Sequence, residues 1–148
     1  MTWLPHTTVA TIVEQDGRLL MVEEVDEGNT VFNQPAGHLD ENETLFEAAV
    51  RETLEETGWH ITLTAFLGTY VTRAPNGITY VRHCFVGTPQ AHDPAIMLDT
   101  GIIAAHWLAP EQILAPGFNA RSPMVVRTVQ DYLDGRRLPL ETIYHHDT

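Results

Sequence analysis

Three glutamates near the middle of the chain are spaced to build a metal site for phosphate chemistry. Glu52 is followed by Glu55 and Glu56, so on a helix the three carboxylates would share one face. Like charges at this spacing destabilise an isolated helix by roughly 0.2–0.5 kcal/mol per pair. Hard divalent cations such as Mg²⁺ and Mn²⁺ relieve this repulsion, because they bind carboxylate oxygens together with water and phosphate oxygens. The cluster therefore indicates a metal site that bridges to a phosphate.

The element that must position these carboxylates is marked as a helix at both ends. Thr44 followed by Glu47 fits a capping box, and Gly58 fits the left-handed residue that ends a helix. Apolar and small residues recur between these marks at helical spacing, which predicts one buried stripe with the glutamates facing out. The residues predicted to be buried are Phe46, Ala49, Val50, Thr53, Leu54 and Thr57.

The spacing around the cluster is more specific than a glutamate-rich solvated face would require. The segment from Gly37 to Gly58 matches the pattern G-x5-E-x7-R-E-U-x-E-E-x-G-U at every charged and glycine position. On this motif the chain resembles the Nudix hydrolase superfamily, with Thr53 standing where an aliphatic residue is usual. Three further stretches, at 32–39, 121–126 and 135–143, resemble the NudJ-type phosphatase branch and extend the similarity over most of the chain.

The resemblance implies a fold, a cofactor and roles for the charged residues. The implied fold is α/β, a Nudix-fold α/β/α sandwich with a mixed β-sheet, and the implied cofactor is Mg²⁺, with Mn²⁺ as an alternative. Glu43 and Arg51 would form a supporting ion pair, and a charged group of this kind is costly to bury without its partner. The implied metal ligands are the backbone carbonyl of Ala36 and the carboxylates of Glu52, Glu55 and Glu56.

The reaction implied by the resemblance is in-line attack of a metal-activated water on phosphorus. Its general base is open among Glu52, Asp93 and Asp99, and we favour Glu52. Many relatives carry an acid directly before the segment Ile-x-x-x-Trp, whereas this sequence has Gly101 there and Asp99 two residues upstream.

Residues just before the motif are candidates for contact with a substrate. Phe32 could stack on a heterocycle while Asn33 and Gln34 hydrogen-bond to its edge, although a packing cluster at a strand end is an equally good interpretation. His38 could contact a phosphate or could brace the loop.

Two arginines outside the motif are candidates for binding an anion. Arg121 comes just before Ser122 and Pro123, a pair typical of a helix start, and the N-terminus of a helix favours phosphate. Arg82 lies on a predicted strand and is the second choice.

Periodicity predicts five strands, at 7–14, 18–24, 61–72, 78–87 and 103–108. Turns are expected at Asp16-Gly17 and at Pro75-Asn76-Gly77. A short turn near 110–114 and a C-terminal helix at 122–133 complete the predicted elements, which agree with a sandwich of helices on a sheet.

Composition limits the classes of partner. The 148 residues fit one Nudix hydrolase domain spanning 1–148, and the net charge of −12, with arginine as the only strong base, argues against nonspecific nucleic-acid binding. Cys84 is the only cysteine, so a buried inert thiol is expected. No leader and no apolar run of about 20 residues is apparent, so we expect a cytoplasmic protein that does not bind membranes. A monomer or a homodimer is expected.

The resemblance implies removal of the terminal phosphate from nucleoside tri- and diphosphates and from thiamine-type pyrophosphates, so the expected partner is a phosphorylated small-molecule substrate. Hydrolysis of ADP-ribose or dinucleoside polyphosphates is one alternative. A noncatalytic module that binds a nucleotide is another, and the intact glutamates favour the enzyme.

Overall fold

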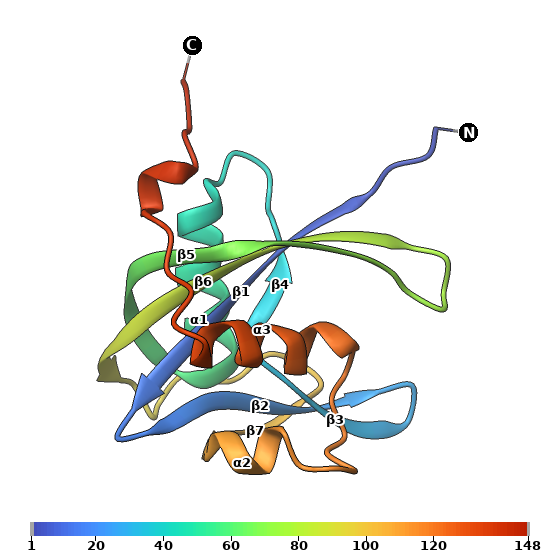
Figure 1. The fold of residues 1–148 in the computed structure, drawn as a ribbon, viewed down its shortest axis with the longest axis vertical. Helices are drawn as coiled ribbons and strands as arrows, with labels where there is room; N and C mark the ends of the chain where they lie inside the picture. Colours follow the sequence, from blue (N-terminus) through green and yellow to red (C-terminus); the bar gives the residue numbers. More distant parts are fainter. Residues whose placement is uncertain (1, 148) are drawn as a thin grey trace.

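The computed structural model describes residues 2–147, in which seven strands and their helices form an α/β fold with a mixed sheet, as predicted (Figure 1). The strands are β1 (His6–Gln15), β2 (Arg18–Asp26), β3 (Asn29–Asn33), β4 (Ala36–His38), β5 (Trp59–Arg73), β6 (Thr79–His92) and β7 (Ile102–Leu108). The helices are α1 (Leu45–Thr57), α2 (Pro110–Ile113), α3 (Pro123–Leu133) and the 3-10 helix η1 (Leu140–Thr142). None of the helices in this part of the chain is long and apolar enough to cross a membrane.

Strand β1 is the centre of the architecture because it pairs with three others. It runs parallel to β6 along most of its length, pairs antiparallel with β4 near its start, and pairs antiparallel with β2 at its end. Strand β2 also pairs with β3 and β7, while β5 pairs with β6. All pairings other than β1 with β6 are antiparallel, which makes the sheet mixed.

The two faces of the sheet are covered by α1 and α3, as alternation along the strands requires. On β1, Val9 packs in a cluster with Ala48 and Ala49 of α1, whereas its neighbour Ala10 packs in a cluster with Val125 of α3. Cys84 lies on the α3 side and is fully buried, which confirms the expected buried thiol. The sheet therefore separates one core under α1 from another under α3.

The two hairpin turns are confirmed, whereas the number of strands was predicted wrongly. Asp16 and Gly17 both have positive φ, 51° and 78°, as a tight two-residue hairpin turn requires. Strands β3 and β4 were not predicted, because β4 has only three residues and is a strand through its backbone pairing with β1. The long strands also extend further than predicted, with Trp59 at the start of β5 paired with His92 at the end of β6.

Candidate active site

Helix α1 begins and ends where its capping residues predict. The hydroxyl of Thr44 accepts a hydrogen bond from the Glu47 backbone N–H at 3.0 Å, and Glu47 Oε1 accepts one from the Thr44 N–H at 2.9 Å. Gly58 has φ of 77°, and its N–H donates to the carbonyl of Leu54. These local contacts fix the position of the helix that carries the glutamates.

The prediction that the glutamates of α1 face out is wrong for Glu52 and Glu56, whereas the side chain of Glu55 is 40% exposed. Glu52 and Glu56 are buried, with 9% and 8% of their surfaces exposed. The fully buried face consists of Ala48, Ala49, Glu52, Thr53, Glu56 and Thr57, while Phe46, Val50 and Leu54 are only half-buried. A hydropathy pattern assigns every carboxylate of a helix to the solvent-exposed face. This assignment fails where the carboxylates of a helix point into the protein.

Two of the three glutamates meet an acid from a different part of the chain. Glu52, Glu56 and Asp99 each offer a carboxylate oxygen, and these oxygens lie within 4.8 Å of one another. Asp99 comes from the segment before β7, where its backbone N–H donates to the carbonyl of Glu55 at 3.1 Å. The Glu55 carboxylate itself turns to Arg51, at 3.1 Å. We call Glu52, Glu56 and Asp99 the carboxylate cluster.

Strand β4 forms the other side of the carboxylate cluster. The Ala36 N–H donates to Glu56 Oε1 at 2.9 Å. Gly37 packs so closely against Glu52 that a Cβ at residue 37 would overlap the carboxylate. A glycine here leaves room for the Glu52 carboxylate, and the strand holds Ala36, the predicted carbonyl ligand, beside Glu56.

The electrostatics of the carboxylate cluster favour a cation. Burial, together with the negative charges of Glu52 and Glu24, raises the pKa of Glu56 to about 8, against the opposing hydrogen bond from the Ala36 N–H. Burial also raises the pKa of Glu52, although the guanidinium of Arg51 opposes that shift. Carboxylates crowded in a poorly solvated place gain from a positive charge, and an all-oxygen donor set suits Mg²⁺ or Mn²⁺. The residues present therefore fit the divalent metal that the motif implies.

Arg51 connects the loop before α1 to the glutamates on the helix. Its Nε and Nη2 donate to the two oxygens of Glu43 at 2.6 and 2.9 Å, a bidentate pair, and Nη2 also donates to the His38 carbonyl. Its Nη1 donates to Glu52 at 2.8 Å and to Glu55 at 3.1 Å. The hydrogen bond from Arg51 lowers the pKa of Glu43, and Glu43 in turn raises the pKa of Arg51. Arg51 thus orients Glu52 from the side.

Two of the candidate substrate contacts lie beneath the surface. Gln34 is 1% exposed, and its amide donates to the Val125 carbonyl at 2.9 Å while its oxygen accepts from Arg82 at 2.6 Å. Arg82 is also buried and donates to Asn33 at 3.1 Å. These bonds connect the end of β3 to β6 and α3, so in this conformation neither side chain is available to a substrate.

Phe32 and Glu24 point to opposite faces of the sheet. Phe32 lies directly across from Glu23 of β2, and residues directly opposite on paired strands point to the same face. Its ring centroid is 5.2 Å from that of Phe118 and 6.2 Å from that of His106. Phe32 is thus part of an aromatic packing group.

His38 and Arg121 are exposed, and His38 directly follows Gly37, which packs against Glu52 of the carboxylate cluster. His38 Nε2 lies 3.0 Å from His6 Nδ1, and burial lowers the pKa of His38, with the charges of His6 and Arg121 lowering it further. Arg121 donates to Glu24 at 2.8 Å and has Asp26 at 3.8 Å. A neutral histidine and an exposed guanidinium are suitable groups for contact with a phosphate.

Glu24 is a residue of the site that the sequence analysis missed. It lies on β2 with only 6% of its surface exposed, and its charge contributes to the raised pKa of Glu56. The sequence carried no alternating signal for it, because Leu19, Leu20, Met21 and Val22 are all apolar and buried, on both faces of β2.

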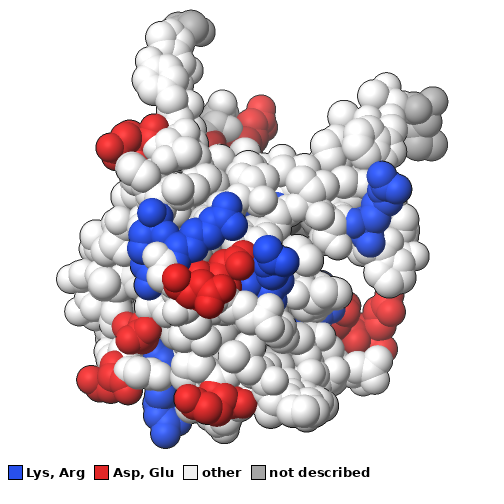
Figure 2. Space-filling view, in the orientation of Figure 1, with Lys and Arg blue, Asp and Glu red and all other residues white. Residues whose placement is uncertain are grey.

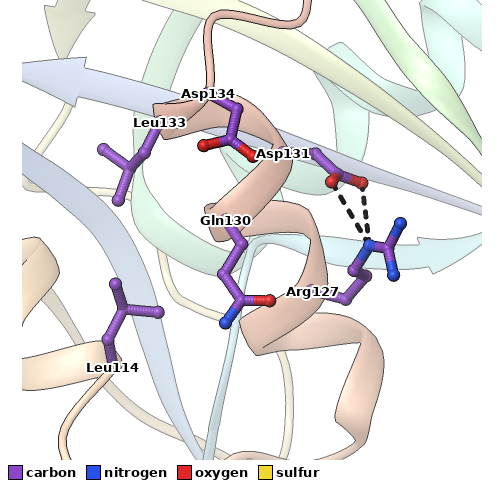
Figure 3. A pocket seen from close by; sticks show the side chains of 6 residues that line it. All are labelled: Leu114, Arg127, Gln130, Asp131, Leu133 and Asp134. Atoms are coloured by element: carbon purple, nitrogen blue, oxygen red, sulfur yellow. Dashed lines mark hydrogen bonds and ion pairs between the residues drawn. The ribbon is translucent and has the colours of Figure 1, made fainter.

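Two surface hollows lie away from the carboxylate cluster. One of about 440 Å³ lies between α2 and α3, where Arg127 and Asp131 turn toward each other (Figure 3), and its lining comprises Leu114, Arg127, Gln130, Asp131, Leu133 and Asp134. Another of about 550 Å³ lies between α1 and β5 and is mainly apolar. Basic and acidic side chains are intermixed on the face over α3 (Figure 2), in keeping with the ion pairs of Arg127 and Arg136 with Asp131. Neither hollow is lined by a member of the cluster.

Known proteins resemble this chain in sequence and in structure. The family model described as the NUDIX domain matches residues 4–128. Phosphatase NudJ of Escherichia coli is 40% identical over 139 residues, covering 94% of this chain and 90% of that protein, and phosphatase NudJ of Shigella flexneri matches equally well. A NUDIX hydrolase from Nitrosomonas europaea is 39% identical with a TM-score of 0.93, covering 97% of this chain and 98% of that one.

Proposed function

The chain belongs to the NUDIX family of hydrolases, and from this premise we propose that it is a Mg²⁺-dependent phosphatase. Its proposed substrates are nucleoside tri- and diphosphates and thiamine-type pyrophosphates, from which it releases orthophosphate. The observation that carries the proposal is the convergence of Glu52, Glu56 and Asp99 within 4.8 Å on and beside the motif helix. The 40% identity to phosphatase NudJ supports the choice of branch.

The proposed metal ligands are the carboxylates of Glu52 and Glu56, joined by the Ala36 carbonyl and by Glu55 or Asp99. Glu55 would have to exchange its contact with Arg51 for the metal, whereas Asp99 already lies with the other two carboxylates. When bound, Mg²⁺ or Mn²⁺ supplies activation of a water molecule and neutralisation of charge on the phosphate oxygens.

We assign the role of general base to Glu52. Its carboxylate is held in place by Arg51 Nη1 and by the close packing of Gly37, so its orientation is fixed before substrate arrives. Burial raises its pKa, which makes it a better proton acceptor near neutral pH than an ordinary glutamate. Asp99, which is exposed, is the second candidate.

We assign substrate contact to the exposed pair His38 and Arg121. Both lie near the carboxylate cluster, where an anionic substrate must be received by a protein with a net charge of −12. Gln34 and Arg82 are assigned to bracing the end of β3, since both are buried. Cytoplasmic location and a monomeric or dimeric state remain predictions.

The experiment that tests the proposal is a product assay with purified protein and Mg²⁺. Nucleoside tri- and diphosphates, thiamine pyrophosphate and ADP-ribose are offered in parallel, and orthophosphate and pyrophosphate are measured separately. Glu52→Gln is the inactive variant. Glu47→Gln is its matched control on the same helix, because glutamine at this position retains the capping box.

Each outcome of this assay has a distinct meaning. Orthophosphate release that is lost in Glu52→Gln and retained in Glu47→Gln supports the proposal. Release of pyrophosphate, or cleavage of ADP-ribose alone, would keep the family and replace the substrate class. Absence of turnover with every substrate would favour a noncatalytic module that binds nucleotides.

A further inference from the structure

The chain offers few cations to an anionic substrate at the carboxylate cluster. Of its eight arginines, Arg51 is held by carboxylates on the motif helix and Arg82 is buried. Arg127 and Arg136 pair with Asp131. Arg121 differs from all of these in its partner, because it is about half-exposed and pairs with Glu24, a buried acid of β2.

The backbone of Arg121 is fixed on both sides. Its N–H donates to the Phe32 carbonyl at 2.8 Å, and the preceding Ala120 forms a parallel β-bridge with Phe32. The next residue, Ser122, is the N-cap of α3 and accepts a hydrogen bond from the Met124 N–H. The starting point of the Arg121 side chain is therefore set by β3 and by α3 together.

Glu24 holds the guanidinium itself. Arg121 Nη1 donates to Glu24 Oε1 at 2.8 Å, and Glu24 is 6% exposed. Glu24 lies opposite Ile102 of β7, and the Ile102 N–H donates to the carbonyl of Asp99 at 3.1 Å, so strand pairing places Glu24 next to the segment that carries Asp99 of the cluster. The negative charge of Glu24 also contributes to the raised pKa of Glu56. A guanidinium carries five N–H donors, and among residues 2–147 the Arg121 side chain makes a hydrogen bond only through Nη1. Its Nη2 lies 3.8 Å from Asp26 Oδ1, an ion pair beyond hydrogen-bond distance, so the donors other than the one bonded to Glu24 can bind a ligand.

We propose that Glu24 is a positioning residue that holds the Arg121 guanidinium beside the carboxylate cluster, where it binds a second phosphate of the substrate. The inference rests on the proposed function and deepens it. A ligand with two linked phosphates can engage Arg121 and the metal site together, whereas a monophosphate ester engages one of them.

The test compares Glu24→Gln with Glu23→Gln, its neighbour on β2. Glu23 points to the opposite sheet face and pairs with His106, so it is a matched control. In Glu24→Gln we expect KM for a nucleoside diphosphate to rise about tenfold, because the guanidinium loses its charged anchor, while kcat stays within about twofold. The Mg²⁺ concentration at half-maximal rate should not change. Arg121→Lys should raise KM similarly, since a lysine lacks the planar fork.

Three results would overturn the inference. A raised half-saturating Mg²⁺ concentration with unchanged KM would make Glu24 a metal ligand. Unchanged values in both Glu24→Gln and Arg121→Lys would make the ion pair merely structural. An equal rise of KM in Glu23→Gln would show a general effect of changing β2. Unfolding midpoints of all variants are recorded, and Arg121→Lys, which leaves the buried acid paired, serves if Glu24→Gln does not fold.

A binding measurement separates this inference from the proposed function. Inorganic pyrophosphate is titrated into the wild-type protein and each variant with Mg²⁺ present, by calorimetry, so no turnover on an organic substrate is needed. About tenfold weaker binding in Glu24→Gln and Arg121→Lys, but not in Glu23→Gln, supports the inference even if the proposed substrates prove wrong. Equal affinity in all four proteins contradicts it even if the proposed activity is found.

Discussion

Gly37 and Glu52 are packed so that the place a Cβ would take on residue 37 is the place of the Glu52 carboxylate. Gly37 lies in β4 and Glu52 on α1, so this close approach joins the strand to the motif helix. The φ of Gly37 is not in the left-handed region, so no turn requires a glycine here. The motif needs a glycine at residue 37 because the Glu52 carboxylate leaves no room for a Cβ.

Gly37→Ala should abolish activity by displacing Glu52. We expect kcat to fall about a hundredfold or more, because a misplaced general base loses most of its contribution. Gly77→Ala, in the turn between β5 and β6, is a remote control: its Cβ enters open space, its φ of 84° strains only the turn, and kcat should stay unchanged. Steady-state kinetics check this, and an active Gly37→Ala would show that the Glu52 position is not critical.

The stabilisation of the protein by Mg²⁺ should increase with pH. The pKa of Glu56 is raised in the folded state to about 8 from 4.5, so the metal-free protein binds this proton more tightly when folded. Its contribution to stability is complete below about pH 4.5 and is lost as pH rises toward 8. Mg²⁺ binds the ionised form, so its effect on Tm should be larger near pH 8.5 than near pH 6. Equal shifts at both values, measured by differential scanning fluorimetry, would refute this.

Glu43→Gln should weaken both the fold and the metal site. Arg51 would keep its charge and lose a bidentate partner, which we expect to lower the free energy of unfolding by about 1–3 kcal/mol. Urea denaturation measures this change. Glu41→Gln, an exposed residue of the same loop, is the control and should stay within about 0.5 kcal/mol of the wild type.

Glu52→Gln and Asp99→Asn should differ in their effect on kcat. If Glu52 is the general base, its loss should lower kcat about 10³-fold, and loss of Asp99 should have a smaller effect. Rates are measured at saturating Mg²⁺, so that weakened metal binding does not dominate. A larger loss of kcat in Asp99→Asn than in Glu52→Gln would identify Asp99 as the general base.

Gln34→Leu should destabilise the protein without changing substrate affinity. The change leaves the Val125 carbonyl and Arg82 without their partner, which should cost about 1–3 kcal/mol. KM should stay within about twofold of the wild type. A raised KM with unchanged stability would contradict this prediction and would support the contact between Gln34 and substrate that the sequence suggests.

Local chemistry made some of the site predictable. Thr44, Glu47 and Gly58 define α1 through contacts within a few residues, so its ends can be predicted from sequence. The ion pair of Glu43 with Arg51 follows from the motif and is present. By contrast, the burial of Glu52 and Glu56 contradicts the prediction from hydropathy. The periodicity of polar residues shows which residues share a helix face, but it does not show whether the rest of the fold covers that face.

The remainder of the site depends on tertiary structure. Asp99 was only one of three candidates for the base, and its meeting with Glu52 requires the segment before β7 to return to α1. Glu24 reaches the site from β2, and its partner Arg121 comes from the start of α3. Such pairings across long sequence separations leave no periodic signal in one sequence.

The parallel pairing of β1 with β6 sets an order on assembly. Helix α1 has its own caps and can form early, but β1 can acquire its parallel neighbour only after the whole chain from β2 through β5 has been made. Contacts between distant segments form slowly, because the loop between them must close first. During synthesis the glutamates of α1 are thus made well before Asp99 and Arg121. Affinity for a metal and for a diphosphate should therefore appear late in folding, after the segments that carry Asp99 and Arg121 have been made.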